Sequence, residues 1–148
     1  MSTRGDNRTV QKSGTIFFSR TYDEVLSLIR ETRDYLTGPG QAALKSLPSE
    51  VSFGYAAESL RLTTRLTECM SWLMFQRALQ TGEISVEQAQ EPECHLQHSD
   101  VCLPTEVAVD AQLLPAGLQS LLDRSEKLYA RVARLDRQGV EAYQKRHG

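Results

Sequence analysis

Apolar residues recur at spacings of three and four in three stretches of the chain, which is the pattern of amphipathic helices. The stretches cover residues 19–37, 52–81 and 115–135. Gly38 follows the first, Gly82 follows the second and Pro115 opens the third, and these residue types favour helix ends and helix starts respectively. The sequence therefore predicts three long helices, the first capped at Ser19 or by Thr21 with Glu24 in capping-box spacing.

The segments between these stretches have weaker patterns. Residues 40–50 contain AALKSL and predict one or two helical turns. Residues 84–90 predict a short helix capped by Ser85, with Gln88 three positions on. Residues 91–112 carry two prolines and no helical period, so this stretch, the Cys-His loop, is predicted to be a long surface connection. Within it, the alternation over 105–109 fits a strand-like segment, although a single strand would have nothing to pair with.

The three stretches predict an all-α fold. Each helix can bury its apolar stripe only against the other two. We therefore expect an antiparallel three-helix bundle over residues 15–138, with the long loop between helices two and three. The polar residues 1–14 are predicted to form a disordered N-terminal tail. Residues 139–148 are predicted to form a frayed C-terminal tail. The expected core includes Leu66, Leu73, Leu121, Leu128 and Val132.

One stripe of the second helix is charged at its N-terminal end and apolar at its C-terminal end. Its members, at spacings of three and four, are Glu58, Arg61, Arg65, Glu68, Trp72, Phe75 and Leu79. Two neighbouring helices cover only part of a central helix, so the apolar end needs a further cover. We interpret the stripe as a partner or dimer interface, with a two-fold related copy as the simplest occupant. In the alternative, Trp72 packs under residues 40–50 or the Cys-His loop of its own chain, and the charged end is a solvated face.

Composition narrows the class of protein. The chain has 148 residues, a formal net charge of -2, 40% hydrophobic and 24% charged residues. Such a charge does not favour nucleic-acid binding, which needs clustered cations. No apolar run approaches the roughly 20 residues that span a bilayer, and the polar start lacks a signal-peptide core. We expect a cytoplasmic protein that binds neither nucleic acid nor membrane, with its three cysteines reduced.

The Cys-His loop offers one candidate metal site. Cys94, His98 and Cys102 are spaced C-x3-H-x3-C, with His95 beside them, and thiolate and imidazole are zinc ligands. Structural zinc motifs have closely paired ligands such as C-x2-C, and the chain offers no second such pair. We therefore expect no metal and no cofactor, and keep a metal or redox sensor as the alternative.

No catalytic residues are predicted. Nucleophilic catalysis needs a Ser or Cys beside a His with an acid behind it. Cys69 lies among apolar neighbours within the second helix, and His147 lies in the tail. No phosphate-binding glycine loop or nucleophile-elbow motif appears. The sequence is not that of an enzyme.

Three segments together resemble a known family. They are FFSRTYDEVLSLIRETRDYL, ESLRLTTRLTECMSWLMFQRAL followed by GEIS, and SEKLYARVARLD, within residues 17–136. In their residues and in their order they are similar to the RcdA family, the regulators of CtrA degradation in alphaproteobacteria. The resemblance implies a dimeric three-helix bundle without catalytic activity. It further implies an adaptor for the AAA+ protease ClpXP that acts with a response-regulator partner on client transcription factors.

The leading hypothesis from the sequence is therefore a non-enzymatic adaptor that helps deliver cell-cycle regulators of the CtrA type to ClpXP. Two alternatives stay open at this point. One is a metal or redox sensor that uses Cys94, His98 and Cys102, and the other is a plain dimeric helical scaffold.

Overall fold

A computed structural model describes the secondary structure of residues 4–103 and 110–148, and the side chains from residue 18 onward within those ranges. All regular structure in these ranges is helical, so the predicted all-α class is confirmed. The helices are α1 (Arg4–Thr37), α2 (Pro39–Leu44), α3 (Ser49–Gln80), α4 (Ser99–Cys102) and α5 (Ala116–His147). Three single 3-10 turns join them, namely η1 (Gln88–Gln90), η2 (Pro92–Cys94) and η3 (Ala111–Leu113).

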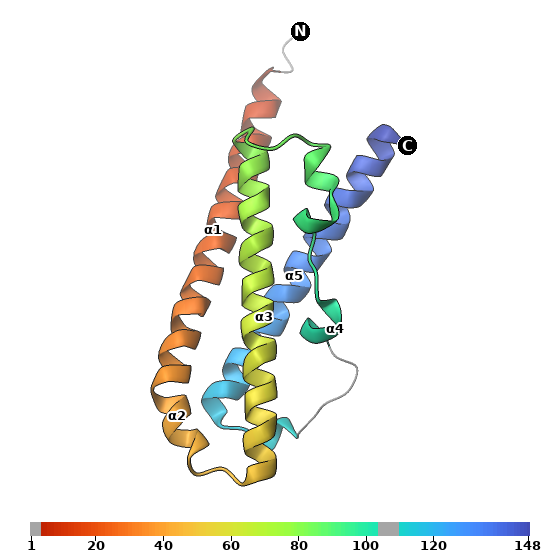
Figure 1. The fold of residues 1–148 in the computed structure, drawn as a ribbon. Coiled ribbons are helices and arrows are strands. Elements are labelled where there is room, and N and C mark those ends of the chain that lie inside the picture. Colours follow the sequence, from red (N-terminus) through yellow and green to blue (C-terminus); the bar gives the residue numbers. More distant parts are fainter. Residues whose placement is uncertain (1–3, 104–109) are drawn as a thin grey trace.

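The three long helices α1, α3 and α5 contact one another and form the body of the molecule (Figure 1). Helix α1 is antiparallel to α5, because Glu24 pairs with Arg131 while Glu31 pairs with Arg124. Helices α3 and α5 run in the same direction, because Arg65 bonds to Ser125 and Trp72 bonds to Asp136 further along both helices.

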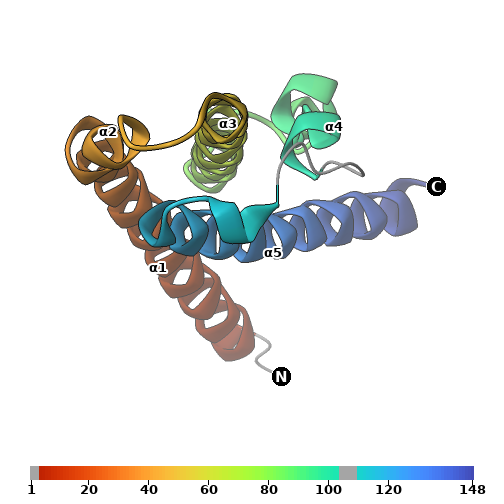
Figure 2. The ribbon, with the colours of Figure 1, turned by 90° about the horizontal axis from the view of Figure 1, so that it is seen from below.

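The predicted antiparallel order is therefore wrong for α3 and α5. The described residues 81–103 of the connection between them run back along α3 as far as Arg61, which bonds to Val101, before α5 begins (Figure 1). A helix that starts at the same end as its predecessor must run parallel to it. Seen from below, α5 crosses the α1 and α3 pair obliquely, and its C-terminal half diverges from α1 (Figure 2).

The core lies between the three long helices. All five residues predicted for it are buried, and the wider core cluster adds residues from α1, α3 and α5. The buried apolar side chains of the long helices include Val25, Leu28, Leu62, Leu66, Leu73, Leu118, Leu121, Leu128, Tyr129 and Val132. Their spacing of three and four in each helix explains why these stretches fold as helices that pack on one face.

Glycine permits close packing where α2 and α5 begin. A β-carbon at Gly40 would lie 2.7 Å from the carbonyl oxygen of Tyr35, and one at Gly117 would lie 2.3 Å from its ring. The Tyr35 side chain thus occupies space that any larger residue at Gly117 would need. At the other end of the molecule, Gly82 has a φ of 78° and ends α3, as the sequence predicts.

Helix boundaries agree with the sequence only in part. The predicted turns in 40–50 appear as α2, and the short helix in 84–90 appears as η1. The predicted start at Ser19 is wrong, because α1 begins at Arg4 and Thr21 is buried inside the helix. Helical backbone also extends into both predicted tails, from residue 4 and up to residue 147. The division into 1–14, 15–138 and 139–148 stays a prediction, and the strand-like segment 105–109 lies outside the described residues.

Candidate protein-interaction site

The charged half of the α3 stripe binds the returning connection of its own chain. Glu58 is buried and forms an ion pair with Arg61. Arg61 also donates a hydrogen bond from Nε to the carbonyl oxygen of Val101 at 2.9 Å. One turn beyond Arg65, Glu68 accepts a hydrogen bond from the backbone N–H of Gln97 at 2.9 Å. These contacts hold residues 97–101 along one side of α3.

Arg65 lies inside the molecule, with only 4% of its surface exposed. Its Nε donates to the carbonyl oxygen of Cys102 at 2.9 Å. Its Nη1 donates to the carbonyl oxygen of Leu122 at 3.1 Å and to Ser125 Oγ at 3.2 Å. Burial lowers the pKa of the Arg65 guanidinium. A buried cation whose hydrogen bonds are satisfied in this way joins α3, α4 and α5 at one point.

The apolar half of the stripe is also covered by the protein's own chain. Trp72 is 3% exposed, and its Nε1 donates to Asp136 Oδ1 of α5 at 3.0 Å. The same carboxylate binds the connection, since its Oδ1 lies 2.8 Å from His95 Nδ1 and its Oδ2 accepts from the N–H of Leu96 at 3.2 Å. Phe18 of α1 packs on the Trp72 ring with 6.0 Å between centroids.

The placement of the stripe corrects the sequence-based interpretation. Glu58, Arg65 and Trp72 are buried within the single chain, so they do not form an exposed stripe. Trp72 bonds to Asp136, which in turn binds His95 and Leu96 of the Cys-His loop, so the arrangement is close to the alternative weighed from the sequence. Arg61, Glu68, Phe75 and Leu79 are half-buried, and two of them hold the loop. A dimer or partner interface that includes the half-buried residues stays a prediction.

The residues proposed as metal ligands are not brought together. Cys94 is buried on η2 and its Sγ bonds to the carbonyl oxygen of Gln88 at 3.4 Å. Cys102 is buried on α4, and His98 is exposed with a left-handed φ of 58°. Among the described residues, no three His, Cys, Asp or Glu side chains group closely enough to hold a metal ion. The metal or redox sensor thus loses its proposed site.

The environments of the three cysteine thiols disfavour reaction. Burial raises the pKa of the Cys69 thiol to about 12 and also raises the pKa of Cys94 and Cys102. The thiolate is the nucleophile and the metal ligand. Buried thiols with raised pKa values therefore suit core packing better than sensing.

A surface that sequence reasoning missed lies on the opposite side of α3. From Phe53 to Met74, the exposed residues of this helix are Phe53, Ala56, Leu60, Thr63, Thr67, Ser71 and Met74. None of them is charged. Phe53, Leu60 and Met74 expose 77%, 65% and 60% of their surface. We call this set the uncharged α3 face.

The hydroxyl groups near this face are satisfied within the helix. Thr63 Oγ1 bonds to the carbonyl oxygen of Ser59 and Thr67 Oγ1 to that of Thr63. Their methyl groups therefore remain to contact a partner. In Figures 1 and 2, α1, α5 and the connection lie on the other sides of α3. The signal in the sequence was the seven-residue spacing of Phe53, Leu60, Thr67 and Met74, which is typical of helix pairing.

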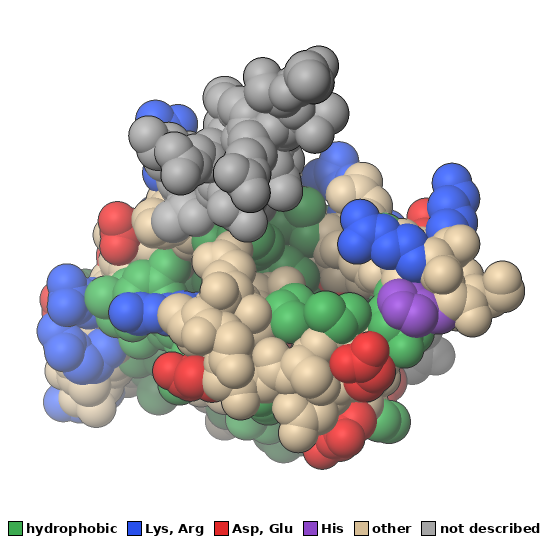
Figure 3. Space-filling view, turned by 90° about the horizontal axis from the view of Figure 1, so that it is seen from above, with side chains coloured by type: hydrophobic (Ala, Val, Ile, Leu, Met, Phe, Trp, Pro, Cys, Tyr) green, Lys and Arg blue, Asp and Glu red, His purple; other side chains and the backbone are tan. Residues whose placement is uncertain are grey.

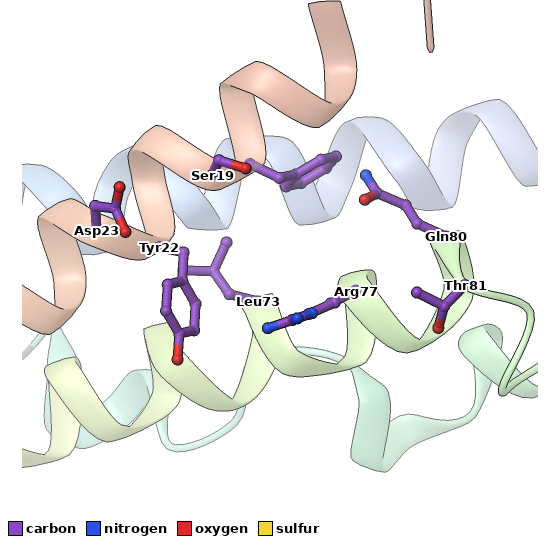
Figure 4. A pocket seen from close by; sticks show the side chains of 8 residues that line it. Ser19, Tyr22, Asp23, Leu73, Arg77, Gln80 and Thr81 are labelled. Carbon is purple, nitrogen blue, oxygen red and sulfur yellow. The ribbon is translucent and has the colours of Figure 1, made fainter. Parts of the chain in front are cut away.

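A groove of about 340 Å³ between α1 and α3 lies beside the C-terminal end of this face. Figure 4 shows Tyr22 on α1 extending toward α3, where Leu73 and Arg77 form the facing wall. The described lining contains neither His nor Cys. It offers an apolar floor with a polar rim rather than a nucleophile and base.

These features define the class of the protein. It is an all-helical protein with a long, exposed and uncharged helix face. No helix in the described part of the chain is long and apolar enough to cross a membrane. A family model described as "Protein of unknown function (DUF1465)" matches residues 10–147, so the chain belongs to this family, which is the RcdA-type family.

A solved structure supports the same placement. The crystal structure of RcdA from Caulobacter crescentus CB15 is 42% identical in sequence and matches with a TM-score of 0.62. The match covers 82% of this chain and 89% of that one. A search of curated proteins finds no match. The resemblance inferred from the three sequence segments is thereby confirmed.

Proposed function

We propose that this protein is a non-enzymatic adaptor in regulated proteolysis. It helps deliver cell-cycle regulators of the CtrA type to the ClpXP protease, together with a response-regulator partner. The observation that carries the proposal is the similarity to RcdA over most of both chains. The role places the protein in the cytoplasm, where ClpXP acts.

Physical features of the surface agree with an adaptor. An adaptor increases the effective concentration of a client at the protease and needs no reactive group for this. It needs at least two surfaces that bind other chains. The uncharged α3 face can form a contact without burying an unpaired charge, which would be costly.

We assign the uncharged α3 face to a homodimer contact. A surface without charge is compatible with a second copy of itself, whereas a face with one sign of charge would repel it. Twenty-two residues from Phe53 to Met74 extend about 33 Å along the helix axis. That length allows three heptads of side chains to pack against the same face of the second copy.

Reconstituted degradation tests the adaptor role. Purified ClpXP, the response regulator and a CtrA-type client are incubated with and without this protein, and client loss is followed by gel electrophoresis. We expect faster degradation when the protein is present, and binding of the protein to the response-regulator–ClpXP complex in a pull-down. A folded protein that neither accelerates degradation nor binds this complex would refute the proposal and leave the plain scaffold.

A further inference from the structure

A second groove, of about 330 Å³, lies where α5 diverges from the rest of the molecule. Trp72 and Leu79 of α3 and Ala89 of η1 line one wall, and Val140, Tyr143 and Arg146 of α5 line the other. Figure 3 shows this end of the molecule, with hydrophobic side chains around a hollow and cationic and histidine side chains toward the end of α5. Its volume is in the range of ligand-binding pockets.

The last turns of α5 present a binding stripe to this groove. Val140, Tyr143 and Arg146 are spaced three apart, Gly139 lies four positions before Tyr143, and all four line the groove. A β-carbon at Gly139 would meet no atom within 4 Å, so the groove is open beside this residue. The Tyr143 ring stacks on His147 with 4.2 Å between centroids, which fixes its position on the wall.

Among the described residues that line this groove, the charged group left available to a ligand is the Arg146 guanidinium. The Asp136 carboxylate at its floor is already occupied by Trp72, His95 and the N–H of Leu96. Arg146 forms no ion pair with any acid among the described residues, and Lys145 adds a second cation beside it.

We propose that this groove binds a short helical segment of a partner protein with two apolar side chains one turn apart and a carboxylate one turn further on. The apolar side chains contact the half-buried Leu79, Val140 and Tyr143, and the carboxylate pairs with Arg146. Helix-in-groove recognition uses this spacing of anchors. The inference deepens the proposed function, because it names the chemistry of one partner of the adaptor.

Trp72 makes the binding test direct, because it is the one tryptophan of the chain and it lines the groove. The probe is a short synthetic peptide with blocked ends, two leucines one helical turn apart and a glutamate one turn beyond. We expect a saturable change in Trp72 emission. Replacing the glutamate by lysine should weaken binding about tenfold, and replacing the leucines by serine should abolish it.

Two pairs of variants locate the peptide. Gly139→Leu fills the open space and should abolish the response with an unchanged or higher unfolding temperature, because glycine is unfavourable within a helix. Gln138→Leu adds the same side chain at an exposed neighbour that does not line the groove, and should bind like wild type. Arg146→Glu should reverse the preference to the lysine peptide, whereas Arg137→Glu, with the same change in charge, should not.

Several outcomes would overturn the inference. One is that the glutamate and lysine peptides bind equally well. Another is that the Gly139→Leu protein binds the peptide as wild type does. A third is that no peptide gives a saturable change in Trp72 emission. A change in oligomeric state with Arg146→Glu would assign the groove to a second copy instead. The titration contains no protease, so peptide binding without client degradation would refute the adaptor role alone, and degradation without peptide binding would refute the groove alone.

Discussion

Arg65 on α3 donates a hydrogen bond from Nε to the main-chain oxygen of Cys102 at 2.9 Å. The bond connects the middle of a long helix to the end of α4, which belongs to the long connection between α3 and α5. Each hydrogen bond found for this buried guanidinium goes to an uncharged oxygen. The arginine therefore acts as a structural clamp, and its position explains why the connection follows α3.

The clamp should be sensitive to substitution. Arg65→Met keeps much of the volume but removes the hydrogen bonds that Arg65 donates to the carbonyl oxygens of Cys102 and Leu122. We expect the free energy of unfolding to fall by about 1–3 kcal/mol and limited proteolysis to cut the connection faster. Urea denaturation measures the first effect, with Arg30→Met at an exposed position as the control. Unchanged stability would mean that removal of the buried charge offsets the lost hydrogen bonds.

Trp72 should contribute to folding rather than to self-association. Trp72→Ala leaves a cavity beside Phe18 and removes the hydrogen bond to Asp136. We expect a loss of about 3–5 kcal/mol in the free energy of unfolding, with an unchanged oligomeric state of the folded fraction in sedimentation. Met74→Ala, at an exposed position of the same helix, should change stability by less than about 0.5 kcal/mol. If the Trp72→Ala protein were as stable as wild type but dissociated, Trp72 would belong to a dimer interface, as interpreted from the sequence.

The sequence predicted local features better than long-range ones. Periodicity located the three long helices and the buried Leu66 and Leu128. It also located the turn at η1, where the N–H of Ser85 bonds to the Gln88 side chain and the N–H of Gln88 bonds to Ser85 Oγ. These features depend on residues three or four positions apart.

The direction of α5 and the position of the connection could not be predicted in this way. Periodicity shows which side of a helix is apolar, but not which segment covers that side. Arg65 and Trp72 are covered by residues from the aperiodic Cys-His loop and from α5, between 37 and 64 positions away. A buried arginine bonded to distant carbonyl oxygens has the same sequence pattern as an exposed one. The uncharged α3 face was missed because its threonines conceal an otherwise regular seven-residue spacing.

The ion pair between Glu31 and Arg124 predicts a small dependence of stability on pH. The two side chains form a bidentate contact at 2.6 and 2.7 Å, and Arg124 lowers the pKa of Glu31 below its usual 4.5. A lowered folded-state pKa stabilises the protein above the unfolded pKa, and this contribution is lost as the pH falls through the folded pKa.

Because both side chains are about half exposed, solvent screens the pair. Glu31→Gln should lower the free energy of unfolding by less than about 1 kcal/mol at neutral pH. The difference from wild type should disappear as the pH falls below the usual pKa of 4.5. Urea denaturation over this pH range measures it, with exposed Glu141→Gln as the control. A difference that grows on acidification would have the wrong sign for this pair.

The buried thiols predict slow modification. With a pKa near 12, Cys69 carries almost no thiolate at mildly alkaline pH, and Cys94 and Cys102 are buried with raised pKa values. We expect an aromatic disulfide reagent to react slowly with the native protein and rapidly with all three thiols in denaturant. Rapid reaction of one native thiol, or stoichiometric zinc by mass spectrometry, would revive the sensor hypothesis.

The uncharged α3 face makes the sharpest prediction about assembly. If two copies pair through it, a charge at its centre would be buried without a partner, which is strongly unfavourable. Leu60→Glu should therefore convert a dimer at tens of micromolar protein into a monomer. Because Leu60 is 65% exposed within the single chain, helix content should be retained. Leu113→Glu introduces the same charge at a site on η3 that is 57% exposed, and should leave the dimer intact. Sedimentation velocity separates the outcomes. A monomeric wild type, or equal dissociation by both variants, would show that α3 is not the dimer contact and would leave this face for another partner.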